Sequence, residues 1–453
     1  MSGNSAPFPP GGAPLAPAAV RRVSIVCFLA WVFSVFDYTL FGTLLPAISD
    51  DYGWDSGTAT AVTTWITIGT FVVSLCVGPM LDRWGRRRAL AVTTAGAAVA
   101  SGLTALAGGK VSMVLIRALS GLGYSEEVVN SVYLNEVYGN NRRRGFMYSF
   151  VQSGWPVGAL LAALVSALLL DTIGWHGVFL FATFPAVVIV LLVRKLPESP
   201  TFVNLTRIRE LRAEGRAGEA AELARHAGVE TGETGRLRDI FTPELRRHTI
   251  CLSAAWLLNW MGIQVFSVLG TTVLTDSKGV SFDSALLVLI LGNAAGFAGY
   301  IAHGYVGDRI GRRLTITIGW LIGGVVMTVM LIGPSSAAFV IPAYALGLFF
   351  LLGPYAALLF YMGESYPAKV RGIGPNTAHI MGPIGAIAGS AVLSVLLSAV
   401  LPMSVAAFFA GAVGILGSGL AMLGTRRVDQ DGSGAASGGP VPSQNPHDLR
   451  STL

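Results

Sequence analysis

A few ionisable residues lie inside long apolar stretches of the sequence, where a charge is costly and usually serves a function. They are Asp37, Arg117, Glu126, Glu127, His303 and His379. A carboxylate beside a guanidinium stays ionised, and it can bind a proton when the guanidinium moves away. Such a pair can therefore take part in proton transport. We find no nucleotide-binding loop, metal-ligand cluster or activated nucleophile in the sequence. We therefore expect no catalytic residue, no cofactor and no metal, and an enzyme is the weakest interpretation.

Asp37 and Arg117 are predicted to lie at one depth in a membrane. If a spanning helix starts near Val23 at the inner face, Asp37 lies about 21 Å along it, or roughly 9 Å below the outer face. The helix of Arg117 starts near Val111 at the outer face, which places Arg117 about 9 Å deep. Beside Arg117 the Asp37 carboxylate stays ionised, and a substrate that engages Arg117 would leave Asp37 to bind a proton. A fixed structural ion pair is the alternative.

Glu127 is the third predicted proton-coupling residue. At about 100° per residue, Glu127 falls about 80° from the direction of Arg117, whereas Glu126 points the opposite way. Glu127 is therefore the better candidate to face a cavity, and the role of Glu126 stays open. His303 and His379 are more simply explained as hydrogen-bonded packing residues, although a function is open for both.

Aromatic and amide side chains are candidates for holding a small polar organic molecule. Trp256, Asn259, Trp260 and Ile263 follow the spacing of one helix face. Helix packing is the alternative explanation for each candidate. The predicted substrate-binding residues are Arg117, Gln152, Trp155, Asn259, Trp260, Gln264 and Tyr355.

The elements that carry these residues are predicted to be membrane-spanning helices. The composition is 53% hydrophobic and 12% charged, and twelve stretches are long and apolar enough to cross a bilayer. With the N-terminus inside, Lys110 and Lys278 are the only lysines or arginines outside, and Arg117 alone lies well within a helix. The stretches start near Val23, Ala61, Ala89, Val111, Gly145, His176, His248, Ser284, Leu314, Ala337, Gly372 and Leu401.

The chain is predicted to divide into two six-helix halves, residues 21–195 and 248–427. Residues 1–20 and 428–453 are rich in Gly, Pro, Ala or Ser and are predicted to be disordered tails. Residues 196–247 form a charged cytoplasmic connecting loop with one or two short amphipathic helices. The net charge of +6 comes from short clusters between apolar runs, so it reflects topology and not a nucleic-acid partner.

One loop motif occurs twice, 226 residues apart, as GPMLDRWGRRR from Gly78 and GYVGDRIGRR from Gly304. A Glu that precedes Arg-Gly by seven or eight residues is also repeated. Such repeats indicate duplicated six-helix units, and their charges can link helices in one conformation and separate in another. Arginines that only fix topology are the alternative. The predicted cytoplasmic gate residues are Asp82, Arg86, Glu136, Arg144, Asp308, Arg312, Glu364 and Arg371.

With both copies intact, the sequence resembles the major facilitator superfamily over residues 21–427. Arg117-Ala-Leu-Ser-Gly121-Leu-Gly123 and Leu196-Pro-Glu198-Ser-Pro also look like motifs of that superfamily. The resemblance implies an all-α polytopic membrane protein with twelve transmembrane helices, built as two six-helix halves with inverted repeats. It also implies that helices one and four are neighbours, and that similar members couple protons through an Asp and an Arg at these positions.

The run from Arg144 to Gly158 resembles the sialate and lactate proton symporters, and Phe36-Asp37-Tyr38 also fits the aromatic-acid symporters. We therefore expect a proton-coupled symporter of a small organic acid or related metabolite, working by alternating access. A proton antiporter that exports a drug or antibiotic is the first alternative, and a non-transporting membrane sensor is the second. The expected partners are a small-molecule substrate, protons and the lipid bilayer. A monomer in the cell (inner) membrane, with several crossings and both termini cytoplasmic, is the expected form.

Overall fold

The computed structural model describes residues 15–138, 147, 150–227, 236–367, 370 and 373–428. Within these residues all regular elements are helical. The first half and the connecting loop contain α1 (Pro17–Tyr52), α2 (Ser56–Ser74), α3 (Val77–Trp84), α4 (Arg86–Thr104), α5 (Lys110–Ala118), α6 (Gly121–Tyr124), α7 (Glu126–Tyr138), α9 (Gly154–Arg194), α10 (Pro200–Ala213), α11 (Ala217–His226) and η1 (Leu237–Phe241). The second half contains α12 (Pro243–Ile263), η2 (Gln264–Val268), α13 (Gly270–Lys278), α14 (Phe282–Ile310), α15 (Arg312–Ile332), α16 (Ala337–Leu352), α17 (Tyr355–Ser365), α18 (Ile373–His379), α19 (Met381–Ser398), α20 (Met403–Ala407), η4 (Phe408–Ala412) and α21 (Val413–Met422).

The helices account for twelve membrane crossings. In the described ranges, nine helical stretches are long and apolar enough to span a bilayer. One of them contains α9, which holds two helices because Gly174 leaves the helical conformation with φ 64° and ψ 172°. Helix α4 and the broken series α5, α6 and α7 provide the remaining two crossings. The predicted fold class is therefore confirmed.

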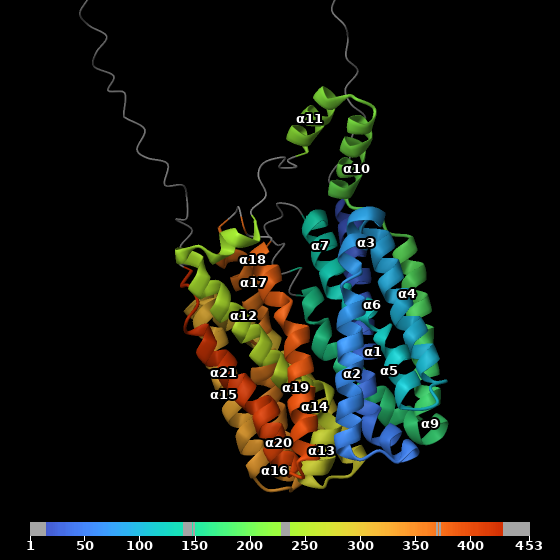
Figure 1. Ribbon diagram of the computed structural model, residues 1–453, viewed down its shortest axis with the longest axis vertical. Helices are drawn as coiled ribbons and strands as arrows, with labels where there is room; N and C mark the ends of the chain where they lie inside the picture. Colours follow the sequence, from blue (N-terminus) through green and yellow to red (C-terminus); the bar gives the residue numbers. More distant parts are fainter. Residues whose placement is uncertain are drawn as a thin grey trace, which may run out of the picture.

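The two halves form separate helical bundles that lie side by side. Figure 1 shows α1 to α9 in blue and green on one side and α12 to α21 in yellow to red on the other. Helices α10 and α11 project beyond the bundles, and we call that end of the molecule the connector end. Helices α10 and α11 pack on each other through a small core of their own, made of Ile208, Leu211, Ala220 and Ala224.

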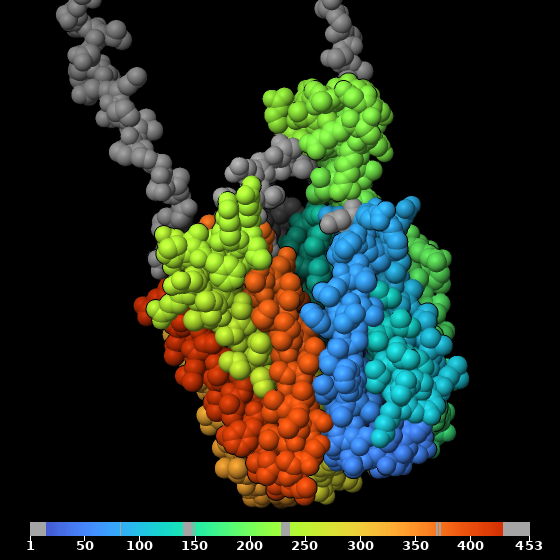
Figure 2. All heavy atoms as spheres, in the orientation of Figure 1, coloured from blue at the N-terminus to red at the C-terminus, as the bar shows by residue number. Residues whose placement is uncertain are grey.

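The halves are joined most closely toward the end opposite the connector. Thr271 on α13 donates hydrogen bonds to the carbonyl oxygens of Gly42 (3.0 Å) and Thr43 (2.9 Å) on α1. A Cβ at Gly42 would lie 2.1 Å from the carbonyl oxygen of Val268, so glycine permits this approach. Ser394 on α19 donates to the carbonyl oxygen of Gly57 on α2 at 3.2 Å, and Figure 2 shows α19 in orange lying along α2 in blue.

Several predicted boundaries can be compared with these helices. Helix α1 begins at Pro17, inside the predicted tail 1–20, because Pro17 suits the first position of a helix. Helices α10 and α11 lie in the predicted connecting loop. The predicted start of the fifth crossing at Gly145, the gate residues Arg144 and Arg371, and nearly all of the predicted tail 428–453 lie outside the described residues.

Candidate functional site

Asp37 and Arg117 meet inside the first half, where both side chains are buried. Nη1 of Arg117 donates to Oδ1 of Asp37 at 2.8 Å, and Nη2 donates to the Asp37 carbonyl oxygen at the same distance. Ser101 on α4 also donates to Oδ1 of Asp37. Helices α1, α4 and α5 therefore converge on one carboxylate. The structure brings the two residues together as their predicted depths required.

Aromatic rings and an unpaired donor complete the surroundings of Arg117. Its guanidinium carbon lies 5.6 Å from the ring centre of Phe179 and 5.8 Å from that of Phe41, within cation–π range. Nε of Arg117 is buried without a hydrogen-bond partner among the described residues. Arg117 lines a pocket of about 290 Å³ together with Tyr38, Thr67, Ser120 and Gln264.

A second, larger cavity lies between the halves and is mainly aromatic. Its volume is about 350 Å³, and the predicted substrate residues Gln152, Trp155, Trp260 and Tyr355 all line it. Trp155 of the first half and Trp260 of the second half meet edge to face, with ring centres 5.3 Å apart. The remaining lining residues are Trp31, Glu127, Trp256, Ile263, Tyr300, Leu352 and Leu359.

Two tryptophans that line this cavity have indole donors without an acceptor. Nε1 of Trp155 and Nε1 of Trp260 are both buried, and neither makes a hydrogen bond to any residue in the part of the chain that the structure describes. A buried polar group without a partner is costly, so these donors suit a ligand that brings acceptors. An aromatic molecule with a carboxylate or hydroxyl group fits both the rings and the donors.

Tyr38 lies between the aromatic cavity and the Asp37–Arg117 pair. Its ring packs on Tyr124 with centres 5.4 Å apart and on Trp155 at 6.2 Å. Its hydroxyl donates to Oε1 of Gln264 at 3.1 Å, which joins α1 to η2 of the other half. Tyr38 follows Asp37 directly in α1, so a ligand that displaces Tyr38 would also disturb Asp37.

The other predicted substrate residues lie around the aromatic cavity without lining it. Asn259 is behind Tyr355, whose hydroxyl donates to Oδ1 of Asn259 at 2.8 Å, and Asn259 in turn donates to Ser418 at 3.3 Å. Gln264 and Arg117 line the smaller pocket instead. The structure thus separates the predicted substrate residues into an aromatic group and an Arg117 group, with Tyr38 between them.

Glu127 and His379 connect the halves across the site. Nε2 of His379 on α18 lies 3.0 Å from Oε2 of Glu127 on α7, and the His379 ring packs on Trp256 with centres 4.9 Å apart. Glu127 lines the aromatic cavity, in agreement with its predicted direction. His303 does not reach the site, since its Nδ1 contacts the Gly299 carbonyl oxygen and its ring packs on Phe349.

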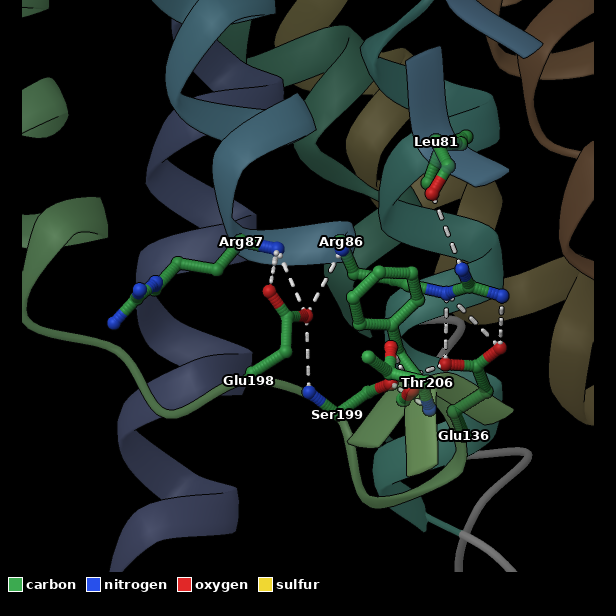
Figure 3. Close-up of polar contacts among 8 residues, drawn as sticks. Leu81, Arg86, Arg87, Glu136, Glu198, Ser199 and Thr206 are labelled. Atoms are coloured by element: carbon green, nitrogen blue, oxygen red, sulfur yellow. Dashed lines mark hydrogen bonds and ion pairs between the residues drawn. The ribbon is translucent and has the colours of Figure 1, made fainter. Parts of the chain in front are cut away.

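Arg86 and Glu136, two of the predicted gate residues of the first half, form a tight cluster at the connector end (Figure 3). Arg86 binds both oxygens of Glu136, with Nη2 to Oε1 at 2.7 Å and Nε to Oε2 at 2.9 Å. Glu198 accepts the backbone N–H groups of Arg86 (2.9 Å) and Arg87 (3.2 Å), which places a carboxylate at the N-terminus of α4. Gly85 has φ 89°, and a Cβ there would lie 2.6 Å from Oε2 of Glu198.

The described gate residues of the second half, Asp308, Arg312 and Glu364, form a more exposed cluster. Arg312 contacts Glu364 through Nη1 and Asp308 through Nη2, the latter at 3.4 Å. In both halves the arginine that follows the motif's glycine pairs with the repeated glutamate, a partner that the sequence analysis did not assign. The side chain of Asp82 lies outside the described structure.

Sequence reasoning missed Trp31 and Tyr300 of the cavity, as well as the position of Tyr38. Trp31 and Tyr38 share a face of α1 at a spacing of seven residues, and this periodicity is the signal that would have found them. Tyr300 has no comparable signal, because it lies in a helix whose apolar residues surround the whole circumference.

Known proteins were compared with the chain by sequence. A model of the Major Facilitator Superfamily matches residues 27–372. The niacin transporter NiaP of Acinetobacter baylyi is 28% identical over 391 residues, which cover 81% of this chain and 84% of that protein. The gallate transporter of Pseudomonas putida is 28% identical over 421 residues, covering 88% and 92%. The 4-hydroxybenzoate transporter PcaK of Pseudomonas aeruginosa is 26% identical over 382 residues, covering 82% and 84%.

Solved structures share the fold at lower identity. The crystal structure of a D-xylose–proton symporter has a TM-score of 0.65 and 19% identity, covering 90% of this chain and 98% of that one. The inward-open xylose transporter XylE from E. coli has a TM-score of 0.67 and 16% identity, covering 91% and 98%. At such identities the likeness extends to the fold alone.

Proposed function

The chain belongs to the Major Facilitator Superfamily of membrane transporters, and from that premise we propose that it is a proton-coupled symporter of a small organic acid. An aromatic carboxylate is the cargo class that fits the cavity best. The observation that carries this proposal is the pair of unpartnered indole donors, Trp155 and Trp260, in an aromatic cavity between the halves. The printed names of three relatives, which concern niacin, gallate and 4-hydroxybenzoate, point to the same class.

The proposed binding mode uses the rings for the cargo's ring and the indoles for its oxygens. Trp155 and Trp260 belong to different halves, so a carboxylate held by both would draw the halves together. Gln152 and Tyr355 line the same cavity and are the proposed polar and aromatic neighbours. Because the cargo would touch groups from both halves, its binding energy can favour one arrangement of the halves over another.

We propose that Tyr38, Asp37 and Arg117 couple transport of the cargo to transport of a proton. With the ion pair closed, the guanidinium of Arg117 offsets the negative charge of Asp37. Cargo that enters beside Trp155 and Tyr38 would loosen the pair, and an unpaired carboxylate in this buried site favours the protonated form. Re-forming the pair would expel the proton. Glu127 is the proposed second participant, since it lines the cavity and contacts His379 of the opposite half.

Alternating access gives the two ends of the molecule their proposed roles. We take the connector end as cytoplasmic, with both termini on that side and the protein as a monomer in the cell (inner) membrane. The contacts of Thr271 with Gly42 and Thr43 support closure of the opposite end. The clusters of Arg86 with Glu136 and of Arg312 with Glu364 are the proposed cytoplasmic gates, together with Asp82, Arg144, Asp308 and Arg371. Each described gate ion pair stays within its own half, as an open cytoplasmic side would require.

A proton antiporter that exports a cationic aromatic drug or antibiotic is the second candidate. Glu127 places a carboxylate in a cavity lined by Trp31, Trp155, Trp256 and Trp260, and aromatic walls of this kind bind cations through their π faces. The unpartnered indole donors favour the acid, because a cation brings no acceptor for them.

Proteoliposomes that contain a pH-sensitive dye separate the two candidates. Nicotinate, gallate and 4-hydroxybenzoate are added outside as labelled acids, and ethidium serves as the cationic aromatic probe. The proposal expects uptake of an acid with acidification of the vesicle interior. Ethidium transport against a counterflow of protons, without any acid uptake, would instead establish the antiporter.

Variants that keep the ring but remove the donor test the binding mode. Trp155→Phe and Trp260→Phe are each expected to raise KM for the transported acid by roughly 10- to 150-fold, because a hydrogen bond to a charged group contributes on the order of 1.5–3 kcal/mol. Trp256→Phe is the matched control in the same cavity. Equal effects in all three variants would assign the rings, and not the indole donors, to recognition.

A further inference from the structure

A second carboxyl group is buried in the first half, apart from Asp37. Glu126 is the first residue of α7 and is fully buried. Its Oε2 accepts hydrogen bonds from Ser34 on α1 at 2.6 Å and from Thr94 on α4 at 3.1 Å. Asn130, one turn along α7, lies with Nδ2 3.5 Å from Oε1. Helices α1, α4 and α7 thus enclose this carboxyl, as α1, α4 and α5 enclose Asp37.

Helix α7 packs against α1 and α4 and touches α6 and α10. Cys27 on α1 is close enough to Glu126 to interact with it electrostatically. Other titratable or charged groups on these elements are Asp37 on α1, Arg86 on α4, Tyr124 on α6 and Glu127 on α7 itself, while α10 meets α7 beside Glu136. Asp37 is paired with Arg117, Arg86 with Glu136, and Glu127 with His379. Glu126 has no ion-pair partner within the described ranges. A buried carboxylate without a cation is costly, so the site suits a carboxyl that carries a proton.

Glu126 and Asp37 occupy successive layers between α1, α4 and the broken series of α5, α6 and α7. Ser34 precedes Asp37 by three residues on α1, and Thr94 precedes Ser101 by seven on α4. At 1.5 Å per residue the two layers are roughly 5–10 Å apart along the helix axes. A hydroxyl and one or two water molecules bridge such a distance in proton transfer.

Polar groups continue from Glu126 toward the connector end. Asn130 donates to the Cys27 carbonyl oxygen at 3.2 Å, and the hydroxyls of Ser24 and Tyr138 lie 2.8 Å apart another turn or two along. Oδ1 of Asn130 is buried and has no donor in the described structure. A proton on Glu126 would supply a hydrogen-bond donor beside Asn130.

We propose that Glu126 is a second proton-binding carboxyl, which relays the coupled proton between Asp37 and the connector end. Glu126 carries a proton at rest and releases it along Asn130 toward the connector end. The proton from Asp37 replaces it through Ser34, and Asp37 then recovers its ion pair with Arg117. One proton enters and one leaves, so the charge of the first half returns to its starting value. The relay role rests on the proton coupling proposed above, whereas proton binding at Glu126 does not.

Infrared difference spectra of the protein in lipid, taken between low and high pH, test proton binding without any substrate. A protonated carboxylic acid gives a C=O band that is lost when it ionises. Glu126→Gln is expected to remove one such component, while Glu127→Gln, its neighbour on α7, keeps it. A spectrum of Glu126→Gln identical to that of the unaltered protein would refute proton exchange at Glu126, whatever the protein transports.

Transport tests the relay. With labelled nicotinate, gallate or 4-hydroxybenzoate, whichever is taken up, Glu126→Gln is expected to keep exchange of external for internal label. Uptake driven by a pH gradient is expected to fall by roughly a hundredfold, the scale on which a positioned proton donor acts. Glu126→Asp, which keeps the carboxyl, should restore part of the driven uptake. Driven uptake that is unaffected in Glu126→Gln would overturn the relay even if the infrared band is lost. If none of the acids is transported, the proposed function fails and the infrared result still decides proton binding at Glu126.

Discussion

The two halves of the molecule share a helix order and a loop motif, yet they place buried charge differently. In the described part of the chain, the two buried carboxyl groups, Asp37 and Glu126, both belong to the first half. The second half contributes neutral polar groups to the centre, among them Asn259 and Tyr355, which bond to each other. The two halves therefore repeat the helix arrangement but not the buried carboxyl groups. We assign proton handling to the first half, while both halves share cargo recognition.

The repeated loops show the same contrast at the connector end. The Arg86 and Glu136 side chains are 8% and 14% exposed, whereas Arg312 and Glu364 are 18% and 45% exposed. Glu198 and the first turn of α10 cover the first cluster (Figure 3). In the second cluster the ring of Phe360 lies over the Arg312 guanidinium at 4.5 Å, and Glu364 stays open to water. An ion pair shielded from water contributes more than an exposed one of the same type, so the two gates should differ in strength.

The largest effect is expected from Arg117→Gln. It leaves Asp37 without its cation in a buried site, and losing one partner of a buried pair costs about 3–5 kcal/mol of stability. Thermal unfolding of the purified protein in detergent measures the loss. The double variant Asp37→Asn with Arg117→Gln removes both charges and is expected to recover most of the stability without recovering proton coupling. A single variant as stable as the unaltered protein would contradict the buried pair.

Glu136→Gln and Glu364→Gln test whether the two gates differ. Glu136→Gln is expected to destabilise the protein by about 2–3 kcal/mol, because Arg86 is mostly shielded from water. Glu364→Gln removes an exposed partner and should cost at most about 1 kcal/mol. Unfolding by urea at low and high salt compares them, and only the second variant should lose its effect at high salt. Equal losses of unfolding free energy in the two variants would mean that the gate ion pair contributes equally to stability in both halves.

The contact between Glu127 and His379 tests the link across the halves. Glu127→Gln and His379→Gln are each expected to weaken uptake, and the double variant should be less impaired than the sum of the two. A coupling of about 1 kcal/mol is expected for residues in direct contact. The initial rate of acid uptake, measured for all four members of the cycle, gives this value. Strict additivity would show that the two side chains act separately.

An effect of similar size to the coupling of Glu127 and His379 concerns the starts of α2 and α14, which begin the second membrane crossing of each half. The backbone N–H of Thr58 donates to Asp55 at 2.6 Å, and this hydrogen bond lowers the pKa of Asp55. A carboxyl whose pKa is lower in the folded state stabilises that state above the unfolded pKa of about 4, and the stabilisation is lost as the pH falls through the folded pKa. Ser281 caps α14 without a charge.

Replacing either cap with alanine is therefore expected to cost about 1 kcal/mol at neutral pH. Only Asp55→Ala should lose its cost in acid, and Asp55→Asn should keep a cap that does not depend on pH. Unfolding measured at neutral and acid pH compares the three variants. A pH-dependent cost for Ser281→Ala would remove this difference between the halves.

Apolar length, charge placement and the repeated motif were sufficient to predict twelve crossings and two halves. Depth counting also placed Asp37 and Arg117 at one depth, because both helices are regular between their predicted starts and these residues. Helix boundaries were less predictable. Gly174 joins two crossings with almost no loop, and no sequence signal tells such a glycine from one inside a helix.

Contacts between distant helices were beyond prediction from the sequence. The partner of Arg86 turned out to be Glu136, fifty residues away, because α4 and α7 pack together. Likewise, Gln264 was predicted to bind the substrate together with Trp260, but the π-helical turn η2 starts at Gln264 and the side chain lines the pocket of Arg117. Local spacing determines a face only as long as the helix stays regular.

The assignment of proton handling to the first half is tested most directly by measuring proton movement in dye-loaded proteoliposomes. The Asp37→Asn variant is compared with the unaltered protein. A transported acid is added outside, and interior acidification and exchange of labelled acid are recorded together. The account predicts that Asp37→Asn keeps exchange, since the aromatic cavity is intact, but loses acidification and uptake against a gradient. Acidification that proceeds unchanged in Asp37→Asn would contradict the account and reduce the Asp37–Arg117 pair to a structural ion pair.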